Sequence, residues 1–207
     1  MIFSKKKTFE QHDNEIPNFY RNSINEFDSK DILEDKFDVD ICVIGGGLTG
    51  VSSALHLAKK GYSVAICESR KIGWGASGRN GGQLGNGMRK DQFTIEKKFG
   101  FEYANELWKL GLESVETALK LINEYKIDCN IQNGVMSAGC FKNDFKDFEL
   151  ELNHMEKYYN YSNLRLLNKE LVKTEINSDM YFSGLLNKGR LEKISAKSSV
   201  CFLQYIK

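Results

Sequence analysis

Residues 39–50 constrain the fold more than any other stretch, because an apolar segment runs directly into a glycine-rich turn. Residues 39–44 are predicted to form a buried strand, and Gly45, Gly47 and Gly50 follow with the spacing G-x-G-x-x-G. In a βαβ unit the first glycine permits a sharp turn, the second lets the backbone approach a pyrophosphate, and the third lets the helix pack closely on the strand. The start of that helix presents N–H groups and a positive dipole to a phosphate. The stretch therefore predicts a nucleotide-binding α/β unit.

The segment after the turn continues the same pattern. Residues 51–60 are predicted to be helical, and Gly61 is predicted to end that helix. The apolar residues expected on one face of the helix are Val51, Ala54, Leu55 and Ala58. A second apolar strand is predicted over residues 62–67, and Glu68 follows it.

An acidic residue at the end of the second strand is where a βαβ dinucleotide fold binds a ribose 2′-hydroxyl. Glu68 occupies that position, and its charge would repel the 2′-phosphate of NADP. Arg70 lies two residues further on and weakens that exclusion. The alternative interpretation is a glycine-rich turn of an ordinary α/β protein, with Glu68 as a solvated strand end.

Composition and net charge limit the class of protein to which the chain can belong. The chain of 207 residues is 41% hydrophobic with a mean hydropathy of −0.43, which is typical of a chain that buries a core in water. Its net charge of +1 gives no support for nucleic-acid binding or a membrane-surface role. No apolar run has the length of a membrane span, and the lysines near the start precede no apolar signal segment.

The five cysteines form no C-x-x-C pair and the three histidines are scattered, so no metal site is expected. Cys42 and Cys67 fall in the two predicted strands, where we expect them to be buried as small hydrophobic residues. Free thiols without an export signal favour a cytoplasmic location.

Residues 69–87 contain seven glycines between positions 73 and 87, too many for a continuous helix or strand. A loop of this kind is either a flexible surface loop or a loop that a ligand orders. Arg79 and Asn80 lie among the glycines and suit the close approach of a flat, polar ligand. Composition alone does not decide between the two interpretations.

The predicted βαβ unit with Glu68, followed by Gly-Ala-Ser-Gly-Arg-Asn-Gly-Gly-Gln at residues 75–83, resembles the FAD-dependent D-amino acid oxidase superfamily. Within this superfamily the chain looks most like the gamma-glutamylputrescine oxidase branch, which is related to sarcosine and glycine oxidases. The resemblance covers residues 17–188. It implies an α/β fold with a Rossmann-like FAD-binding βαβ unit and the start of a mixed α+β substrate domain. The cofactor-binding residues expected are Gly45, Gly47, Leu48, Thr49, Gly50, Glu68, Ser69, Arg70, Gly75, Ala76, Ser77, Arg79, Asn80, Gly81, Gly82 and Gln83.

The resemblance also implies an activity. FAD would oxidise the C–N bond of an amine or amino acid by accepting a hydride, with dioxygen as the expected acceptor of the electrons, and Ser77 would lie near the pyrophosphate. No catalytic residue is identified in this chain. An NAD-dependent dehydrogenase would fit the βαβ unit and Glu68 equally well, but it has no evident use for residues 75–83. A non-catalytic fragment that binds FAD or another nucleotide is the third hypothesis.

Four segments are predicted. Residues 1–36 form an arm that lies over the domain or is partly disordered, residues 37–128 the FAD-binding part with helices, and residues 129–188 the start of the substrate domain. The resemblance ends at Gly189, so residues 189–207 are interpreted as a divergent tail and the chain as a truncated oxidase. The alternative is a short protein whose tail forms a final strand over residues 199–206.

The region after the loop is predicted to be mainly helical at first. Apolar residues at helical spacing predict helices within residues 91–128, where Gly111 should weaken or bend the longest one. Residues 129–142 are predicted to be one or two strands with a turn at Asn133 and Gly134.

Two further helices are predicted after these strands. The first covers residues 143–160 and carries His154, which is expected at the surface. The second covers residues 169–176, with Asn168 as its N-cap.

Overall fold

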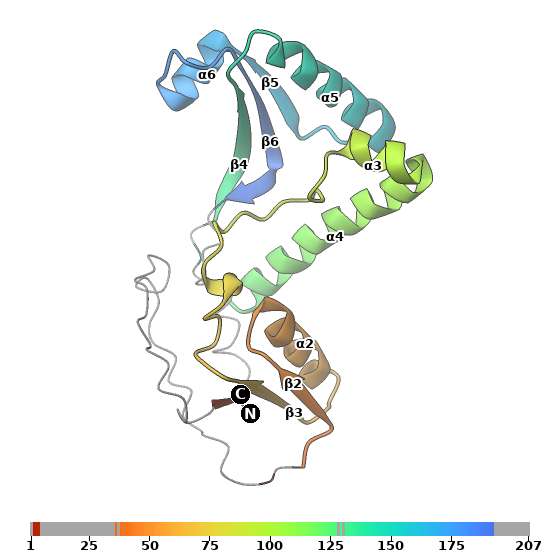
Figure 1. Cartoon of the computed structure of the whole chain (residues 1–207), viewed down its shortest axis with the longest axis vertical. Coiled ribbons are helices and arrows are strands. Elements are labelled where there is room, and N and C mark those ends of the chain that lie inside the picture. The colour runs from red at the N-terminus through yellow and green to blue at the C-terminus, as the bar shows by residue number, and fades with distance from the viewer. Residues whose placement is uncertain (1, 5–35, 37, 128, 130, 193–207) are drawn as a thin grey trace. The chain divides into compact units, whose positions relative to one another are not determined.

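The computed structural model describes residues 2–4, 36, 38–127, 129 and 131–192 (Figure 1). Most of the predicted arm and the tail beyond residue 192, with its expected strand over residues 199–206, lie outside the described residues. The described residues divide into two compact units, the first within residues 2–82 and 120–129 and the second within residues 83–119 and 131–192. The four predicted segments stay a prediction.

The first unit contains a parallel three-stranded sheet with the order β1-β3-β2. The strands are β1 (Ile2–Ser4), β2 (Ile41–Ile44) and β3 (Val64–Glu68), and helix α2 (Leu48–Lys59) packs against β2 and β3 (Figure 1). The predicted strand–turn–helix–strand order is therefore confirmed, although β2 begins two residues later than expected. Strand β1 was not predicted, and it pairs with β3 on the side away from β2.

The core of this unit lies between α2 and β3. Val51 and Ala54 of α2 pack with Ile66 of β3, and Ile72 completes the buried cluster. Ala58 was expected on the same face, but it is exposed because the buried stripe of α2 ends one turn earlier.

Cys42 corrects another expectation, because it is exposed whereas Cys67 is half-buried. Successive side chains of a strand point to opposite faces. Val43 packs against the core, so Cys42 lies on the other face of β2. Its Sγ is 3.7 Å from the Sγ of Cys67, whose pKa is raised by burial and, to a lesser extent, by Cys42.

The second unit contains an antiparallel sheet with the order β4-β6-β5 (Figure 1). Its strands are β4 (Gln132–Gly139), β5 (Leu164–Asn168) and β6 (Ser183–Glu192), and β6 continues through Gly189, where the family resemblance was expected to end. Helices α5 (Asp144–Tyr159) and α6 (Lys169–Ile176) pack on β5 and β6. Helix α6 has its predicted bounds, and the side chain of Asn168 accepts a hydrogen bond from Leu171 N–H.

The predicted turn at Asn133 and Gly134 is wrong. Both residues belong to β4, and the register against β6 shifts between Asn133 and Val135. Gly134 has φ +96° and lies at this irregularity. From the pair Asn133–Leu191 to the pair Val135–Asn187, β4 advances by two residues and β6 by four, so the additional residues lie on β6 and β4 continues without reversal.

Helices α3 (Gln92–Phe99) and α4 (Phe101–Glu124) confirm the predicted helical region. Helix α4 continues without a break through Gly111, and the expected weakening or bend at this residue stays a prediction. A Cβ at Gly111 would overlap the backbone carbonyl oxygen of Asn86. This glycine therefore serves close packing of a loop on the helix.

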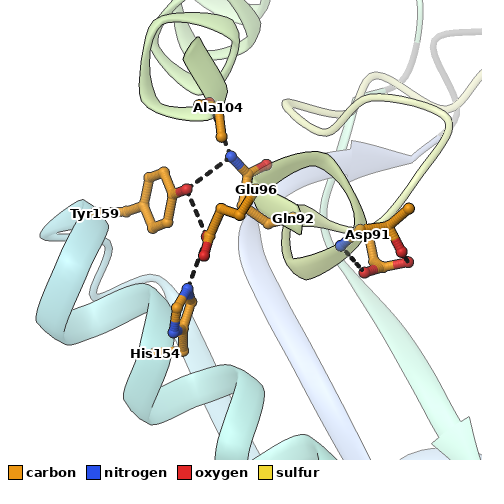
Figure 2. Close-up of polar contacts among 7 residues, drawn as sticks. Asp91, Gln92, Glu96, Ala104, His154 and Tyr159 are labelled. Atoms are coloured by element: carbon orange, nitrogen blue, oxygen red, sulfur yellow. Dashed lines mark hydrogen bonds and ion pairs between the residues drawn. The ribbon is translucent and has the colours of Figure 1, made fainter. Parts of the chain in front are cut away.

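His154 was expected at the surface, but its side chain is only 16% exposed. Its Nε2 lies 2.8 Å from Oε1 of Glu96 on α3, and the same carboxylate oxygen accepts a hydrogen bond from the hydroxyl of Tyr159 at 2.7 Å (Figure 2). Gln92 donates through Nε2 to that hydroxyl at 3.0 Å and to the Ala104 carbonyl at 2.8 Å. The expectation failed because α3 covers this face of α5, and a helical pattern in one segment does not show what packs on it.

Candidate cofactor site

The turn between β2 and α2 has the backbone geometry that its glycines predict. Gly45 has φ +99°, a conformation that favours glycine, and its N–H donates to the Cys67 carbonyl at 2.8 Å. A Cβ at Gly50 would overlap the Gly45 carbonyl oxygen. The third glycine of the motif therefore permits the close approach of helix and strand, as its spacing indicated.

Glu68 lies at the end of β3 and contacts this turn directly. Its Oε2 accepts a hydrogen bond from the Gly46 N–H at 2.7 Å, and its Oε1 accepts one from the Arg70 N–H at 2.9 Å. The side chain is partly buried, so the carboxylate is held at the carboxyl end of the two parallel strands. That edge is where open α/β sheets bind their ligands.

The segment after Glu68 folds back onto the start of α2. The Gly73 N–H donates to the Gly46 carbonyl at 2.9 Å. Further along, the Leu48 N–H in the first turn of α2 donates to Oγ of Ser77 at 2.9 Å. Ser77 lies in a short 3₁₀ helix, η1 (Ala76–Gly78). The Ser77 hydroxyl, which lies in the second glycine-rich loop, therefore contacts the N-terminus of α2, which follows the first glycine-rich turn.

The second loop is also held by contacts of its own. The Asn80 side chain donates to the carbonyls of Ala76 and Ser77, at 3.3 and 2.8 Å, and accepts from the Gly82 N–H at 2.9 Å. A Cβ at Gly78 would overlap the Gly73 carbonyl oxygen. The segment over residues 73–82 is therefore held by specific contacts within the chain, and its ordering by a ligand stays a prediction.

Trp74 lies in the middle of this segment and contacts two arginines. The guanidinium carbon of Arg70 is 3.7 Å from the Trp74 ring centroid, and that of Arg79 is 4.9 Å from it. Nε of Arg79 also donates to the Trp74 carbonyl at 3.0 Å. Both arginines are exposed at the loop surface.

The structure brings many of the predicted site residues together. Direct contacts join Leu48 to Ser77 and Arg70 to Glu68, all within the first unit. Gln83 falls in the second unit, and its contact with the cofactor stays a prediction. The predicted residues of the first unit lie at the turn and start of α2, at the end of β3, or on the second loop: Gly45, Gly47, Leu48, Thr49 and Gly50; Glu68, Ser69 and Arg70; Gly75, Ala76, Ser77, Arg79, Asn80, Gly81 and Gly82.

Three residues of the site were not predicted. Gly46 donates to Glu68, and a Cβ there would overlap Cδ1 of Ile72, so the middle glycine of the turn is as constrained as its neighbours. Gly73 has φ +67° and bonds to the turn. Trp74 stacks with the arginines. The run Gly-Trp-Gly begins five residues after Glu68, but nothing in the run itself indicates which groups the tryptophan contacts.

These features fit a dinucleotide. Gly46 and Gly47 leave the backbone of the turn without Cβ atoms, and the N-terminus of α2 favours an anion. The Glu68 carboxylate is suited to accept hydrogen bonds from a ribose. In the described part of the chain, no group of three or more His, Cys, Asp or Glu side chains could hold a metal ion. None of the described helices combines the length and the apolar character needed to cross a membrane.

The fold and the site define a dinucleotide-binding α/β protein of the Rossmann-like class. Residues 40–190 match the profile of the DAO family, described as FAD dependent oxidoreductase. The match covers well over half of the chain, so the protein belongs to this family, as its resemblance implied. The cofactor of the family is FAD.

Among curated relatives, gamma-glutamylputrescine oxidoreductase of Escherichia coli is 38% identical over 169 residues, 82% of this chain and 39% of the relative. A probable oxidoreductase of Haemophilus influenzae, OrdL, is 34% identical over 158 residues, 75% of this chain and 37% of the relative. The chain therefore spans about two fifths of the length of these relatives.

Solved structures share the fold at low sequence identity. An L-amino acid deaminase from Proteus myxofaciens superposes with a TM-score of 0.64 at 15% identity, covering 83% of this chain and 36% of that chain. Glycine oxidase from Bacillus cereus superposes with a TM-score of 0.54 at 19% identity, covering 81% and 43%. The predicted α/β fold class is confirmed.

Proposed function

We propose that this chain carries the FAD-binding part of an amine oxidoreductase. The observation that carries the proposal is the convergence of Glu68 and Ser77 on one glycine turn, through Gly46 and Leu48. A carboxylate for the ribose and a hydroxyl with helix N–H groups for the pyrophosphate are the two contacts that the dinucleotide requires.

The groups of the chain bind and orient the cofactor. In the proposal, Glu68 accepts hydrogen bonds from the ribose, and the N–H groups at the start of α2, with Ser77 beside them, bind the pyrophosphate. Gly46 and Gly47 let these phosphates approach the backbone. The remaining first-unit residues expected to contact the cofactor belong to the same turn, strand end and loop. FAD, when bound, supplies the acceptor for the hydride that leaves the carbon next to the substrate nitrogen.

The substrate is proposed to be an amine of the gamma-glutamylputrescine type, with dioxygen as the electron acceptor. Support for the substrate comes from the E. coli relative, which is 38% identical over most of this chain. That relative is named for gamma-glutamylputrescine. The amine would give up a hydride from carbon to the flavin and a proton from nitrogen to solvent, and water would hydrolyse the resulting imine to a carbonyl product and ammonia. The whole activity belongs to this proposal, since the chain spans 39% of that relative.

Reconstitution with FAD tests the cofactor assignment. The purified full chain is incubated with FAD, separated from free nucleotide by gel filtration and examined for flavin absorbance in the blue. We expect a yellow protein and an FAD-dependent rise in melting temperature. A colourless protein with an unchanged melting temperature would refute the assignment, and a rise with NAD but not with FAD would favour the dehydrogenase hypothesis.

Activity is then assayed with the yellow protein. Gamma-glutamylputrescine, putrescine and glycine are compared as substrates, with bleaching of the flavin and release of hydrogen peroxide as separate readouts. Bleaching of the flavin by gamma-glutamylputrescine, but not by putrescine or glycine, supports the substrate assignment. Release of hydrogen peroxide supports dioxygen as the electron acceptor. Equal rates with glycine would refute the substrate assignment while the cofactor assignment stands.

A further inference from the structure

We propose that Trp74 is a positioning residue for FAD, because it holds the guanidinium groups of Arg70 and Arg79 beside the glycine turn, where they bind the pyrophosphate. The inference rests on the proposed function, since it concerns how the same site binds FAD. Trp74 itself makes no contact with the cofactor in this proposal, and its effect passes through the two arginines.

The contacts of Trp74 hold both arginines at once. Arg70 stacks on the ring with its guanidinium carbon 3.7 Å from the centroid, and Arg79 approaches the ring at 4.9 Å. The carbonyl of Trp74 accepts a hydrogen bond from Nε of Arg79 at 3.0 Å, so Arg79 is fixed by the backbone as well as by the ring. The Trp74 N–H donates to the Lys71 carbonyl at 2.9 Å, which holds the backbone on the N-terminal side of Trp74.

The position of Trp74 in the chain places this stack next to the turn. Gly73, the preceding residue, is hydrogen-bonded to Gly46, and Ser77, three residues later, is hydrogen-bonded to Leu48. Trp74 therefore lies between two anchor points on the phosphate-binding turn. Arg70 is tied to the same place because its N–H donates to Glu68.

Electrostatics explains why a ring is needed here. Two guanidinium groups repel one another, and each long side chain loses rotamer freedom when it is ordered for a ligand. The face of an indole ring carries a partial negative charge that attracts a cation, so Trp74 offsets the repulsion and orders both groups before the ligand binds. A pyrophosphate, with its two negative charges, is the part of FAD that gains most from a pair of ordered cations.

The test compares FAD affinity between Trp74→Leu and Trp74→Phe in the full chain, titrated by quenching of flavin fluorescence at low and high salt. We expect Trp74→Leu to raise the FAD dissociation constant about tenfold at low salt and to flatten its salt dependence. Trp74→Phe keeps a ring and should recover part of the loss. The matched control is Trp108→Phe, a buried tryptophan of the second unit, which should leave both quantities unchanged.

A double-mutant cycle separates positioning from a merely structural role. If Trp74 acts through Arg79, the double variant Trp74→Leu/Arg79→Gln loses less FAD affinity than the product of the fold-losses in the two single variants. Two results would overturn the inference while FAD binding by the wild type stands. One is a double variant whose loss of FAD affinity equals the product of the two single losses, and the other is an unchanged dissociation constant in Trp74→Leu. Absence of FAD binding by the wild type would instead refute the proposed function. If Trp74→Leu fails to fold, the same criteria apply to Trp74→Phe, whose dissociation constant and salt dependence must change in the same direction.

Discussion

Oε2 of Glu68 lies 2.7 Å from the backbone nitrogen of Gly46, in a hydrogen bond that joins the end of β3 to the turn after β2. The two residues are 22 positions apart in the chain, and the parallel pairing of β2 with β3 brings them to the same sheet edge. The carboxylate therefore orders the turn and also lies where a ribose is expected. Substitution of Glu68 should affect both roles.

Glu68→Gln is expected to raise the FAD dissociation constant about tenfold, because a hydrogen bond to a charged group contributes roughly 1–2 kcal/mol more than one to a neutral group. Glutamine keeps the size of the side chain and one acceptor oxygen, so the turn should still form. Titration of flavin fluorescence measures the change, and Glu175→Gln, on the exposed surface of α6, is the matched control. An unchanged dissociation constant would show that the ribose contact is assigned to the wrong residue.

Gly50→Ala should destabilise the first unit and weaken FAD binding. The added Cβ would overlap the Gly45 carbonyl oxygen and lie 3.3 Å from Cγ1 of Val43, so the start of α2 must move away from β2. Overpacking of this kind costs about 3 kcal/mol, and chemical denaturation measures the loss. Gly85→Ala is the matched control, because its Cβ would meet only the Arg190 side chain at ordinary contact distances of 3.7 Å or more. Equal stability of the two variants would contradict the packing of the turn.

Short-range patterns predicted the elements of the candidate site well. The glycine spacing, the helix after it and the acid at Glu68 each depend on neighbouring residues, so the sequence shows them directly. The hydrogen bond between Leu48 and Ser77 joins positions 29 apart, and no periodicity indicates it. Ser77 was identified only through the family resemblance, and Trp74 was missed because an aromatic residue among glycines has no local signal.

The failures in the second unit have the same physical origin. His154 follows the helical pattern of α5, but its burial depends on α3, which the pattern of α5 does not contain. Asn133 and Gly134 have turn-forming residue types, yet pairing with β6 keeps them in one strand across the register shift. Helix propensity at Gly111 likewise does not show the packing of the loop at Asn86 on this residue. Tertiary contacts override local preference at each of these positions.

Gly111→Ala tests the close packing at Gly111, because packing and helix propensity predict opposite changes in the free energy of unfolding. In an exposed helix, alanine is more favourable than glycine by about 1 kcal/mol. Here the added Cβ would overlap the Asn86 carbonyl oxygen, so we expect destabilisation by about 2 kcal/mol in chemical denaturation. Glu113→Ala, at an exposed position of the same helix, is the control and should change stability by less than about 0.5 kcal/mol. A stabilised Gly111→Ala variant would contradict the close packing.

Tyr159 gives the second unit a predicted sensitivity to alkaline pH. Burial, and then the hydrogen bond to Glu96, raise the pKa of Tyr159 to about 12 from its ordinary value of 10.0. The folded chain thus holds this proton more tightly, so the contribution is complete below pH 10 and is lost as pH rises to about 12. Tyr159→Phe should lower the free energy of unfolding at pH 8 and reduce its fall across that window by about 2 kcal/mol. Tyr158→Phe, an exposed neighbour, is the control; equal alkaline slopes in both variants would contradict the assignment.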